Sequence, residues 1–478
     1  MDAAAKTDEY DLIVLGAGAV GENVADRAVQ GGLTAIIVES ELVGGECSYW
    51  ACMPSKALLR PAQALRAAQH VGGASQAVTG KLDVRAVFDR RDSFTSSWSD
   101  DGQVKWLDSA GIDLARGFGR LTGEREVTVT DADGGTRVLR ARHAVAISTG
   151  SEAVIPPIDG LREASPWTSR EATSAEELPE SLAVIGGGVV AVEMATVYAS
   201  LGAKVTIIAR GELLASMEPF AGERVAAGLK ELGVDVRTST GTTSVHRGDA
   251  GVTLTLDGGE EIVASEVLVA TGRSAHNRDI GLETVGLEPG KWIETDDTLR
   301  VPGVDWLYAV GDVNGRVLLT HQGKYQARAA GDVIVARAKG DDIDDSPWGR
   351  HVATADHAAV PQVTFSFPEV ASAGLTEAAA REAGHDVKVI DYDLGAIAGA
   401  SVYEDGFEGQ ARLVIDTARD VVIGATFVGP EVAELIQAAT IAIVGEVPIA
   451  RLWHAVPAYP TISEIWLRLL EGYGRDSA

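Results

Sequence analysis

Residues 10–21 read YDLIVLGAGAVG, an apolar strand pattern that runs directly into a glycine-rich loop. A helical stretch from 21 to about 30 follows, and a second apolar strand over 34–38 ends at Glu39. In this order the glycines permit a tight turn and the close approach of a pyrophosphate to the helix N-terminus, and the acid meets a ribose hydroxyl. The stretch therefore predicts a Rossmann-like dinucleotide-binding domain. Its loop glycines are Gly16, Gly18 and Gly21.

The only two cysteines of the 478-residue chain, Cys47 and Cys52, lie in the segment GGECSYWACMPSK at 44–56. Pro54 and the helical-looking stretch 56–69 place Cys52 near a helix N-terminus, where the helix dipole and free N–H groups stabilise a thiolate. The alternative is a pair of buried structural thiols, which is the usual fate of free cysteine. Because a dinucleotide loop lies just upstream, the pair indicates a redox-active disulfide beside a flavin.

A second nucleotide-binding unit begins with the apolar strand 182–185 and continues through a glycine-rich loop into a helix that ends near Leu201. The next strand, 204–208, is followed by Arg210 instead of an acid. A carboxylate there would repel a 2′-phosphate, whereas an arginine can pair with one. This favours NADPH over NADH, with an ordinary exposed arginine as the alternative. The loop and helix residues expected at this coenzyme are Gly186, Gly188 and Glu193.

Three further strand ends carry glycine. Gly150 and Gly272 each follow an apolar strand, and we interpret them as points where the chain crosses between domains. Residues 308–312 repeat the strand-then-Gly-Asp pattern and place Asp312 where its carboxylate can bind a ribitol or ribose hydroxyl. Taken alone, a Gly-Asp pair is more often a turn.

From about Pro361 the pattern changes to alternating strands (362–367, 411–417 and 421–428), then helices near 431–444 and 463–471, without a nucleotide loop. This α+β module is suited to packing or dimerisation. We therefore expect an α/β fold with two Rossmann-like domains, for FAD and NAD(P), and a C-terminal α+β dimerisation domain. The predicted limits are 1–155 for the first part of the FAD domain with the redox disulfide, 156–278 for the NAD(P) domain, 279–350 for the second FAD or central part, and 351–478 for the dimerisation domain.

The formal net charge is −28, from 41 basic and 69 acidic residues dispersed along the chain. Such a balance disfavours nucleic acid and anionic membranes as partners. No segment reaches about eighteen uncharged apolar residues, so no membrane span is expected. Residues 1–11 lack the basic region and apolar core of a signal peptide. We expect a cytoplasmic protein without a metal site, in which two cysteines indicate redox chemistry.

On these motifs the chain resembles the pyridine nucleotide–disulfide oxidoreductases, the group of dihydrolipoamide dehydrogenase, glutathione reductase and mercuric reductase. The resemblance runs from Leu12 to about Leu470, in the family's domain order. It implies bound FAD, a homodimer, and electron flow from the nicotinamide through flavin and disulfide to a small-molecule acceptor. The implied FAD contacts are Gly16, Gly18, Gly21, Glu39, Lys56, Gly150 and Asp312, and those for NAD(P) are Gly186, Gly188, Glu193, Arg210 and Gly272.

The resemblance also implies roles in the reaction. Cys47 would be the interchange thiol that faces the acceptor, and Cys52 the thiol next to the flavin. Lys56 would lie near flavin N5 and pair with Glu193. The attacking species is a thiolate, so its pKa must be depressed. Among the nucleotide contacts, Glu39 would hold the adenosine ribose and Asp312 the ribitol.

One segment departs from the family pattern. Disulfide-reducing members supply His-Pro-Thr-x-x-Glu from the partner subunit, whereas residues 458–464 read AYPTISE, with Tyr459 in the histidine position. A phenol with a pKa near ~10 is a poor proton shuttle at neutral pH. Glu464 is then either a residue that supports catalysis or the end of a capping box that begins at Thr461. His454 is an alternative acid, although a lone histidine is more often structural.

Mercuric reductases and soluble transhydrogenases also carry tyrosine in this position, but neither comparison is complete. Mercuric reductases add a C-terminal cysteine pair, which this chain lacks. Soluble transhydrogenases lack an intact redox cysteine pair, whereas this chain has one. Tyr49 and Trp50 beside the disulfide either narrow access, offer a stacking face to a flat acceptor such as a quinone, or are core residues.

The sequence thus predicts an FAD-dependent NAD(P)H oxidoreductase that passes electrons through Cys47 and Cys52 to a small disulfide. The alternative is a non-disulfide acceptor, such as a quinone, a metal ion or another nicotinamide, because Tyr459 replaces the usual histidine. A non-catalytic redox sensor is a third hypothesis, against which the intact Lys56 and Glu193 argue. The acceptor itself cannot be read from the sequence.

Overall fold

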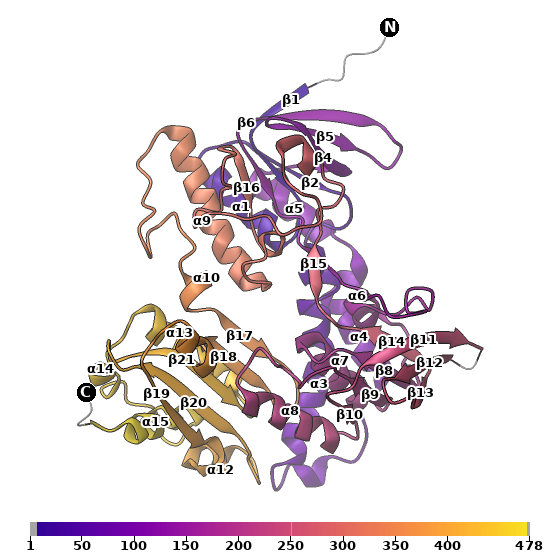
Figure 1. The fold of residues 1–478 in the computed structure, drawn as a ribbon, viewed down its shortest axis with the longest axis vertical. Coiled ribbons are helices and arrows are strands. Elements are labelled where there is room, and N and C mark those ends of the chain that lie inside the picture. Colours follow the sequence, from indigo (N-terminus) through magenta and orange to yellow (C-terminus); the bar gives the residue numbers. More distant parts are fainter. Residues whose placement is uncertain (1–6, 250, 476–478) are drawn as a thin grey trace. The chain divides into compact units, whose positions relative to one another are not determined.

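The computed structural model describes residues 7–249 and 251–475, which form two compact units (Figure 1). The chain passes from one unit to the other after residue 153 and again after residue 272. Both positions are close to the domain crossings expected near Gly150 and Gly272. Each unit is discontinuous in sequence. The first comprises the chain up to residue 54, residues 92–153 and residues 273–356; the second comprises residues 55–91, 154–272 and the chain from 357.

The first unit contains a seven-stranded sheet with the order β3-β2-β1-β6-β5-β4, in which β16 also pairs with β6. The pairs that join β1, β2, β3, β6 and β16 are parallel, and those that β4 and β5 make are antiparallel. Residues 12–15 are at most 2% exposed, a continuous buried run typical of a parallel strand covered on both faces. The strands are β1 (Thr7–Leu15), β2 (Ala35–Glu39), β3 (Asp113–Arg116), β4 (Phe118–Gly123), β5 (Glu126–Thr130), β6 (Thr136–Ile147) and β16 (Leu307–Ala309).

Two helices, α1 (Ala19–Gln30) and α9 (Thr320–Lys339), pack together against one face of this sheet. Glycines bring their backbones close. A Cβ at Gly323 would lie 2.5 Å from Val20 Cγ2, and one at Gly331 would lie 2.4 Å from Arg27 Cβ. Larger residues at these two glycines would therefore push the helices apart. The other helices and strands of this unit are α2 (Gly45–Tyr49), α5 (Asp101–Ala110), β7 (Ser151–Ala153) and β15 (Arg273–Ala275), with α10 (Ala355–Ala358) at its end.

The second unit contains a parallel sheet of order β10-β9-β8-β14 beside an antiparallel sheet of order β11-β12-β13. Helix α7 (Val189–Leu201) is almost entirely buried, as its apolar sequence requires. The strands are β8 (Ser181–Ile185), β9 (Lys204–Ile208), β10 (Asp235–Arg237), β11 (Thr242–Gly248), β12 (Gly251–Leu256), β13 (Glu261–Ala264) and β14 (Glu266–Val269). The helices are α3 (Cys52–Gln69), which begins in the first unit, α4 (Val84–Phe94), which ends in it, α6 (Ser169–Ser174) and α8 (Pro219–Glu231).

The C-terminal part of the second unit is an antiparallel five-stranded sheet of order β17-β18-β21-β20-β19 with helices, which confirms the predicted α+β module. The first predicted strand is shorter than expected, and two strands, β18 and β19, were not predicted. The strands are β17 (Pro361–Thr364), β18 (Val370–Gly374), β19 (Val387–Asp393), β20 (Gln410–Asp416) and β21 (Val421–Val428). The helices are α11 (Glu377–Glu382), α12 (Ala398–Tyr403), α13 (Val432–Val444), α14 (Ile449–Leu452) and α15 (Ile465–Tyr473).

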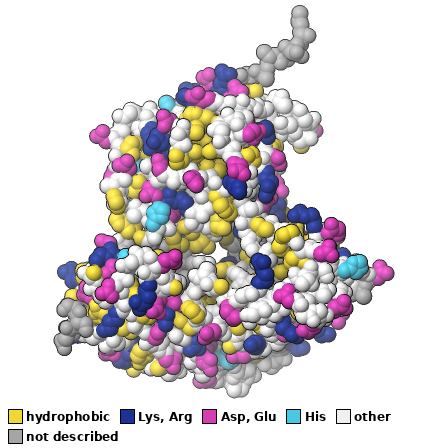
Figure 2. Space-filling view, in the orientation of Figure 1, with side chains coloured by type: hydrophobic (Ala, Val, Ile, Leu, Met, Phe, Trp, Pro, Cys, Tyr) yellow, Lys and Arg dark blue, Asp and Glu magenta, His cyan; other side chains and the backbone are white. Residues whose placement is uncertain are grey.

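The surface carries both signs of charge. On the face drawn in Figure 2, acidic and basic side chains are interspersed, in keeping with acidic residues dispersed along the sequence. Within the described residues, none of the helices has the length and apolar character needed to cross a membrane.

Candidate active site

The two cysteines lie in consecutive helices of the segment 44–56. Cys47 is in α2, and Cys52 is the first residue of α3, as the sequence predicts. Neither is joined in a disulfide, both are partly exposed, and they hydrogen-bond each other. Cys52 Sγ also lies 3.2 Å from the Thr320 hydroxyl oxygen at the start of α9. The arrangement is that of a partly accessible dithiol rather than of two buried structural thiols.

Opposing effects act on the Cys47 thiol. The hydrogen bond that the Cys47 thiol donates to Cys52, together with burial, raises the pKa of Cys47 strongly, while a hydrogen bond with Thr320 and the charge of Lys324 lower it. In the reduced pair, Cys47 therefore keeps its proton more firmly unless a positive charge compensates.

Of the two aromatic residues beside the pair, Tyr49 is part of the core and Trp50 is half-buried. Tyr49 is 1% exposed, and its hydroxyl donates to the Val43 carbonyl at 3.1 Å. Trp50 meets the Tyr49 ring edge-on, with 5.7 Å between ring centroids. Tyr49 thus offers no ring face for a flat acceptor. Of the alternatives given for Tyr49, the structure supports a core residue.

Lys56 and Glu193 form an ion pair inside the second unit. Lys56 Nζ lies 2.7 Å from Glu193 Oε2, and the Phe365 N–H donates to Oε1 at 2.9 Å. Glu193 is 3% exposed, and Lys56 Nζ also lies 5.0 Å from the centroid of the Phe365 ring. The pairing expected from the family resemblance is present, and the carboxylate has a partner for each of its oxygens.

The first glycine loop leaves room for a ligand. Gly18 precedes α1 in extended conformation, and a Cβ built on it would meet nothing within 4 Å. At the end of β2, Glu39 accepts hydrogen bonds from the Ala17 N–H at 2.7 Å and from the Glu41 N–H at 2.7 Å. Glu39 therefore also braces the loop that it follows, a contact that the sequence did not predict.

Asp312 lies at the end of β16 within a small polar network. The Ser151 hydroxyl donates to Asp312 Oδ2 at 2.6 Å, and Arg273 Nε donates to the Ser151 hydroxyl oxygen at 2.6 Å. Burial raises the pKa of Asp312, opposed by Ser151 and Arg273. Sequence reasoning missed Ser151 and Arg273, because only their pairing in β7 and β15 brings them beside Asp312.

The two residues before Gly150 carry buried polar atoms without hydrogen-bond partners among the described residues. The buried hydroxyls of Ser148 and Thr149 have no hydrogen-bond partner among the described residues, and a Cβ at Gly150 would meet nothing within 4 Å. Buried polar groups normally find partners, so these hydroxyls indicate a site for a polar ligand. Together with the open Gly18 loop and the Asp312 network, the donor set of this unit fits FAD.

The second glycine loop lies between β8 and α7 and is open in the same way. Gly188 precedes α7 with no atom within 4 Å of a built Cβ, as is also true of Gly272. Gly186 has a φ of 135°, which favours glycine. Since β8 and β9 are parallel neighbours, this loop and the exposed Arg210 lie at the same edge of the sheet. The arrangement fits a dinucleotide.

The segment around Tyr459 corrects one interpretation. The Thr461 side chain makes no capping hydrogen bond and instead donates to the Ala458 carbonyl at 2.6 Å. Glu464 is 4% exposed and accepts from Arg468 Nη2 at 2.7 Å. The capping-box interpretation was therefore wrong, because an ion pair one turn further along the chain engages the carboxylate. Tyr459 is 75% exposed.

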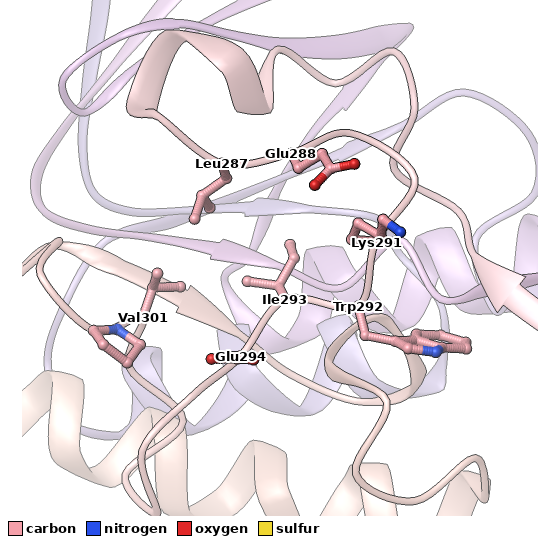
Figure 3. A pocket seen from close by; sticks show the side chains of 8 residues that line it. Leu287, Glu288, Lys291, Trp292, Ile293, Glu294 and Val301 are labelled. Carbon is pink, nitrogen blue, oxygen red and sulfur yellow. The ribbon is translucent and has the colours of Figure 1, made fainter.

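A surface hollow of about 510 Å³ in the first unit contains none of the predicted site residues (Figure 3). Its lining residues are Leu287, Glu288, Lys291, Trp292, Ile293, Glu294, Val301 and Pro302. In the part of the chain that the structure describes, no group of three or more His, Cys, Asp or Glu residues could hold a metal ion.

Comparisons with known proteins give consistent results. The family described as "Pyridine nucleotide-disulphide oxidoreductase" matches residues 10–330, and its dimerisation domain matches residues 360–469. A dihydrolipoyl dehydrogenase of Chlorobaculum tepidum is 33% identical, with 95% of each chain covered. A mercuric reductase of Streptomyces lividans is 32% identical over 95% of this chain and 94% of its own.

Among solved structures, the fold is similar to that of "Cu(II) complex of HOCl-induced flavoprotein disulfide reductase RclA from Escherichia coli". The TM-score is 0.82 and the identity 23%, with 97% of this chain and 99% of that chain covered. At that identity the likeness concerns the fold alone.

Proposed function

The chain belongs to the pyridine nucleotide–disulphide oxidoreductase family, and from that premise we propose that it oxidises NADPH and passes the electrons through Cys47 and Cys52 to a small disulfide. The family is FAD-dependent and works with a pyridine nucleotide, and the dimerisation domain supports a homodimer. The proposal adds the coenzyme, the use of the dithiol and the acceptor class. Its main support is the partly exposed, hydrogen-bonded cysteine pair, with Cys47 in α2 and Cys52 at the start of α3.

Bound FAD would supply the two-electron relay between the nicotinamide and the cysteine pair. We assign its phosphates to the first glycine loop, its adenosine ribose to Glu39 and its ribitol to Asp312. In this proposal Ser151 and Arg273 orient Asp312, and the ion pair with Glu193 holds the Lys56 ammonium in place. Among the remaining contacts, Gly16, Gly18, Gly21 and Gly150 line the FAD site, and Gly186, Gly188 and Gly272 line the coenzyme site.

The acceptor half of the reaction uses the two cysteines directly. The Cys47 thiolate attacks one sulfur of the acceptor disulfide, forming a mixed disulfide and releasing the first acceptor thiolate. The Cys52 thiolate then attacks the Cys47 sulfur, which re-forms the Cys47–Cys52 bond and releases the second acceptor thiolate. Two electrons have then passed to the acceptor, and each released thiolate takes up a proton from the surroundings.

Arg210 supports NADPH as the coenzyme. It is exposed, follows β9 and lies at the sheet edge that carries the second glycine loop. A guanidinium recognises a phosphate through paired, charge-assisted hydrogen bonds, which a ribose hydroxyl alone cannot supply.

A second candidate function is reduction of a non-disulfide acceptor. The names of the relatives include both a dihydrolipoyl and a mercuric substrate. The exposed Tyr459 favours this candidate, because a quinone or metal ion does not need a histidine to protonate a leaving thiolate. Glu464, engaged by Arg468, is then a structural residue.

An anaerobic titration with NADPH tests the use of the dithiol. We expect a long-wavelength absorbance band, from a thiolate beside the flavin, before the flavin absorbance is lost. The Cys52→Ser variant should lack that band. Loss of the flavin absorbance with no such band in the native protein would contradict the proposal.

The acceptor is tested by substitution of the interchange thiol. Cys47→Ser should abolish reduction of small disulfides such as lipoamide. Retention of disulfide reduction by Cys47→Ser would contradict the assignment of this cysteine. Native protein that reduces quinones or metal ions but no disulfide would favour the second candidate.

A further inference from the structure

Helix α9 presents two polar side chains, one turn apart, to the cysteine pair. Thr320 lies 3.2 Å from Cys52 Sγ and hydrogen-bonds Cys47 as well. Residues four apart share a helix face, so Lys324 lies on the same side as Thr320. Its positive charge acts on the Cys47 thiol, in agreement with that geometry.

The charge of this lysine also acts on a buried carboxylate. Glu22 is in the first turn of α1, and its Oε1 is buried without a hydrogen-bond partner among the described residues. The close contact of α1 and α9 at Gly323 and Val20 brings Glu22 and Lys324 within electrostatic reach. Glu22 also faces the charge of Glu39 on β2. The ammonium of Lys324 thus acts electrostatically on both a thiol and a carboxylate.

This position matters because Lys324 is the cation whose charge acts on the Cys47 thiol. Its neighbours Cys52 and Thr320 are neutral when protonated, and burial disfavours the thiolate. The residue in the histidine position, Tyr459, carries no positive charge in any protonation state. A lysine from the same chain can supply the missing cation without help from a partner subunit.

We propose that Lys324 is a positioning residue that stabilises the Cys47 thiolate, and that Glu22 tunes how much of the lysine's charge the thiolate experiences. The inference rests on the proposed function only in naming Cys47 as the thiol that attacks the acceptor. The alternative is a purely structural Lys324–Glu22 pair between α1 and α9.

The test measures the ionisation of Cys47 directly. In the Cys52→Ser holoprotein Cys47 is the only thiol, since the chain has two cysteines. The rate of its alkylation by iodoacetamide is followed by intact mass from pH 6 to pH 10, without coenzyme or acceptor. Because only the thiolate reacts, the pH profile reports the pKa of Cys47.

On this background, Lys324→Met should raise the Cys47 pKa by about one unit, which slows alkylation at neutral pH about tenfold. Lys324→Arg keeps the charge and should leave the profile near that of the parent. Glu22→Gln should shift the pKa downward, because it removes the opposing charge.

Lys339→Met is the matched control. It removes one exposed positive charge from the last turn of the same helix. Fifteen residues of helix separate it from Lys324, about 22 Å, which is well beyond a Debye length at physiological salt. This variant should leave the profile unchanged.

The proposal is overturned if Lys324→Met gives the same profile as Lys339→Met, or if Glu22→Gln raises the Cys47 pKa or leaves it unchanged. Circular dichroism and flavin absorbance report whether each variant folds. Should Lys324→Met fail to fold, the direction of the Glu22→Gln shift decides. A normal alkylation result combined with a failed NADPH titration would contradict the proposed function alone.

Discussion

Replacing Lys56 with methionine should destabilise the second unit by leaving a buried carboxylate short of its main partner. The side chain of Glu193 is 4% exposed, and it keeps only the Phe365 N–H once the ammonium at 2.7 Å is gone. Removing one partner of a fully buried ion pair costs about 3–5 kcal/mol. The Lys56 side chain is 36% exposed, so water can reach the carboxylate from that side, and we expect about 2–3 kcal/mol.

The assay is thermal unfolding of the holoprotein, followed by circular dichroism at fixed FAD concentration. For domains of this size about 1 kcal/mol corresponds to ~2–4 °C, so Lys56→Met should lower the midpoint by roughly 4–12 °C. The double variant Lys56→Met/Glu193→Gln should be more stable than the single variant Lys56→Met. The glutamine amide carries no charge, yet its oxygen can still accept the hydrogen bond from the Phe365 N–H. Such coupling between neighbouring residues is what a double-mutant cycle measures.

Lys204→Met provides the matched control for this prediction. Lys204 lies 3.8 Å from Glu180, with both side chains more than 80% exposed, and such surface pairs contribute about 0–1 kcal/mol. The reasoning is refuted if Lys56→Met costs no more than Lys204→Met. It is also refuted if the double variant is no more stable than Lys56→Met.

The remaining predictions concern turnover, coenzyme choice, pH and cofactor retention. Tyr459→His should raise disulfide reductase activity in steady-state assays if proton supply limits it, and no gain with any disulfide would argue against that limit. Arg210→Ala should raise the KM for NADPH at least ~10-fold while leaving the KM for NADH nearly unchanged; equal effects would exclude a 2′-phosphate contact. Burial raises the pKa of Glu22 from 4.5 to about 7, so folding stability should fall as the pH rises through that window, and thermal midpoints of Glu22→Gln should lack this fall. Ser151→Ala removes the hydroxyl that donates to Asp312 and should weaken FAD retention ~10-fold, measured by dialysis and flavin fluorescence.

The glycine loops and the start of α3 could be predicted from the sequence because their chemistry is local. A turn that brings a pyrophosphate to a helix N-terminus needs glycine at fixed spacing, whatever the rest of the fold does. The strand 204–208 was predicted with its observed limits, and the preceding helix was predicted to end near Leu201, where α7 does end. Strand β18 was missed because its sequence, VASAG, consists mostly of small residues without a clear strand pattern.

Even within a short segment, the partner that a side chain takes required the tertiary structure. Glu464 and Thr461 have the spacing of a capping box, yet Arg468 engages the carboxylate and Thr461 turns to its own loop. Two partners are possible for such a side chain, and only packing selects between them.

The sequence by itself determined the family, the two nucleotide-binding loops and the cysteine pair, since each depends on short-range spacing that nucleotide and thiol chemistry require. Only the tertiary structure decided what surrounds them. It brought Ser151 and Arg273 to Asp312 by pairing two short strands, and it placed Lys324 on α9 within electrostatic reach of Cys47 and of Glu22 on α1. Electrostatic and hydrogen-bonding partners act through space over a few ångströms, and residues almost 300 positions apart become such partners only when the chain folds.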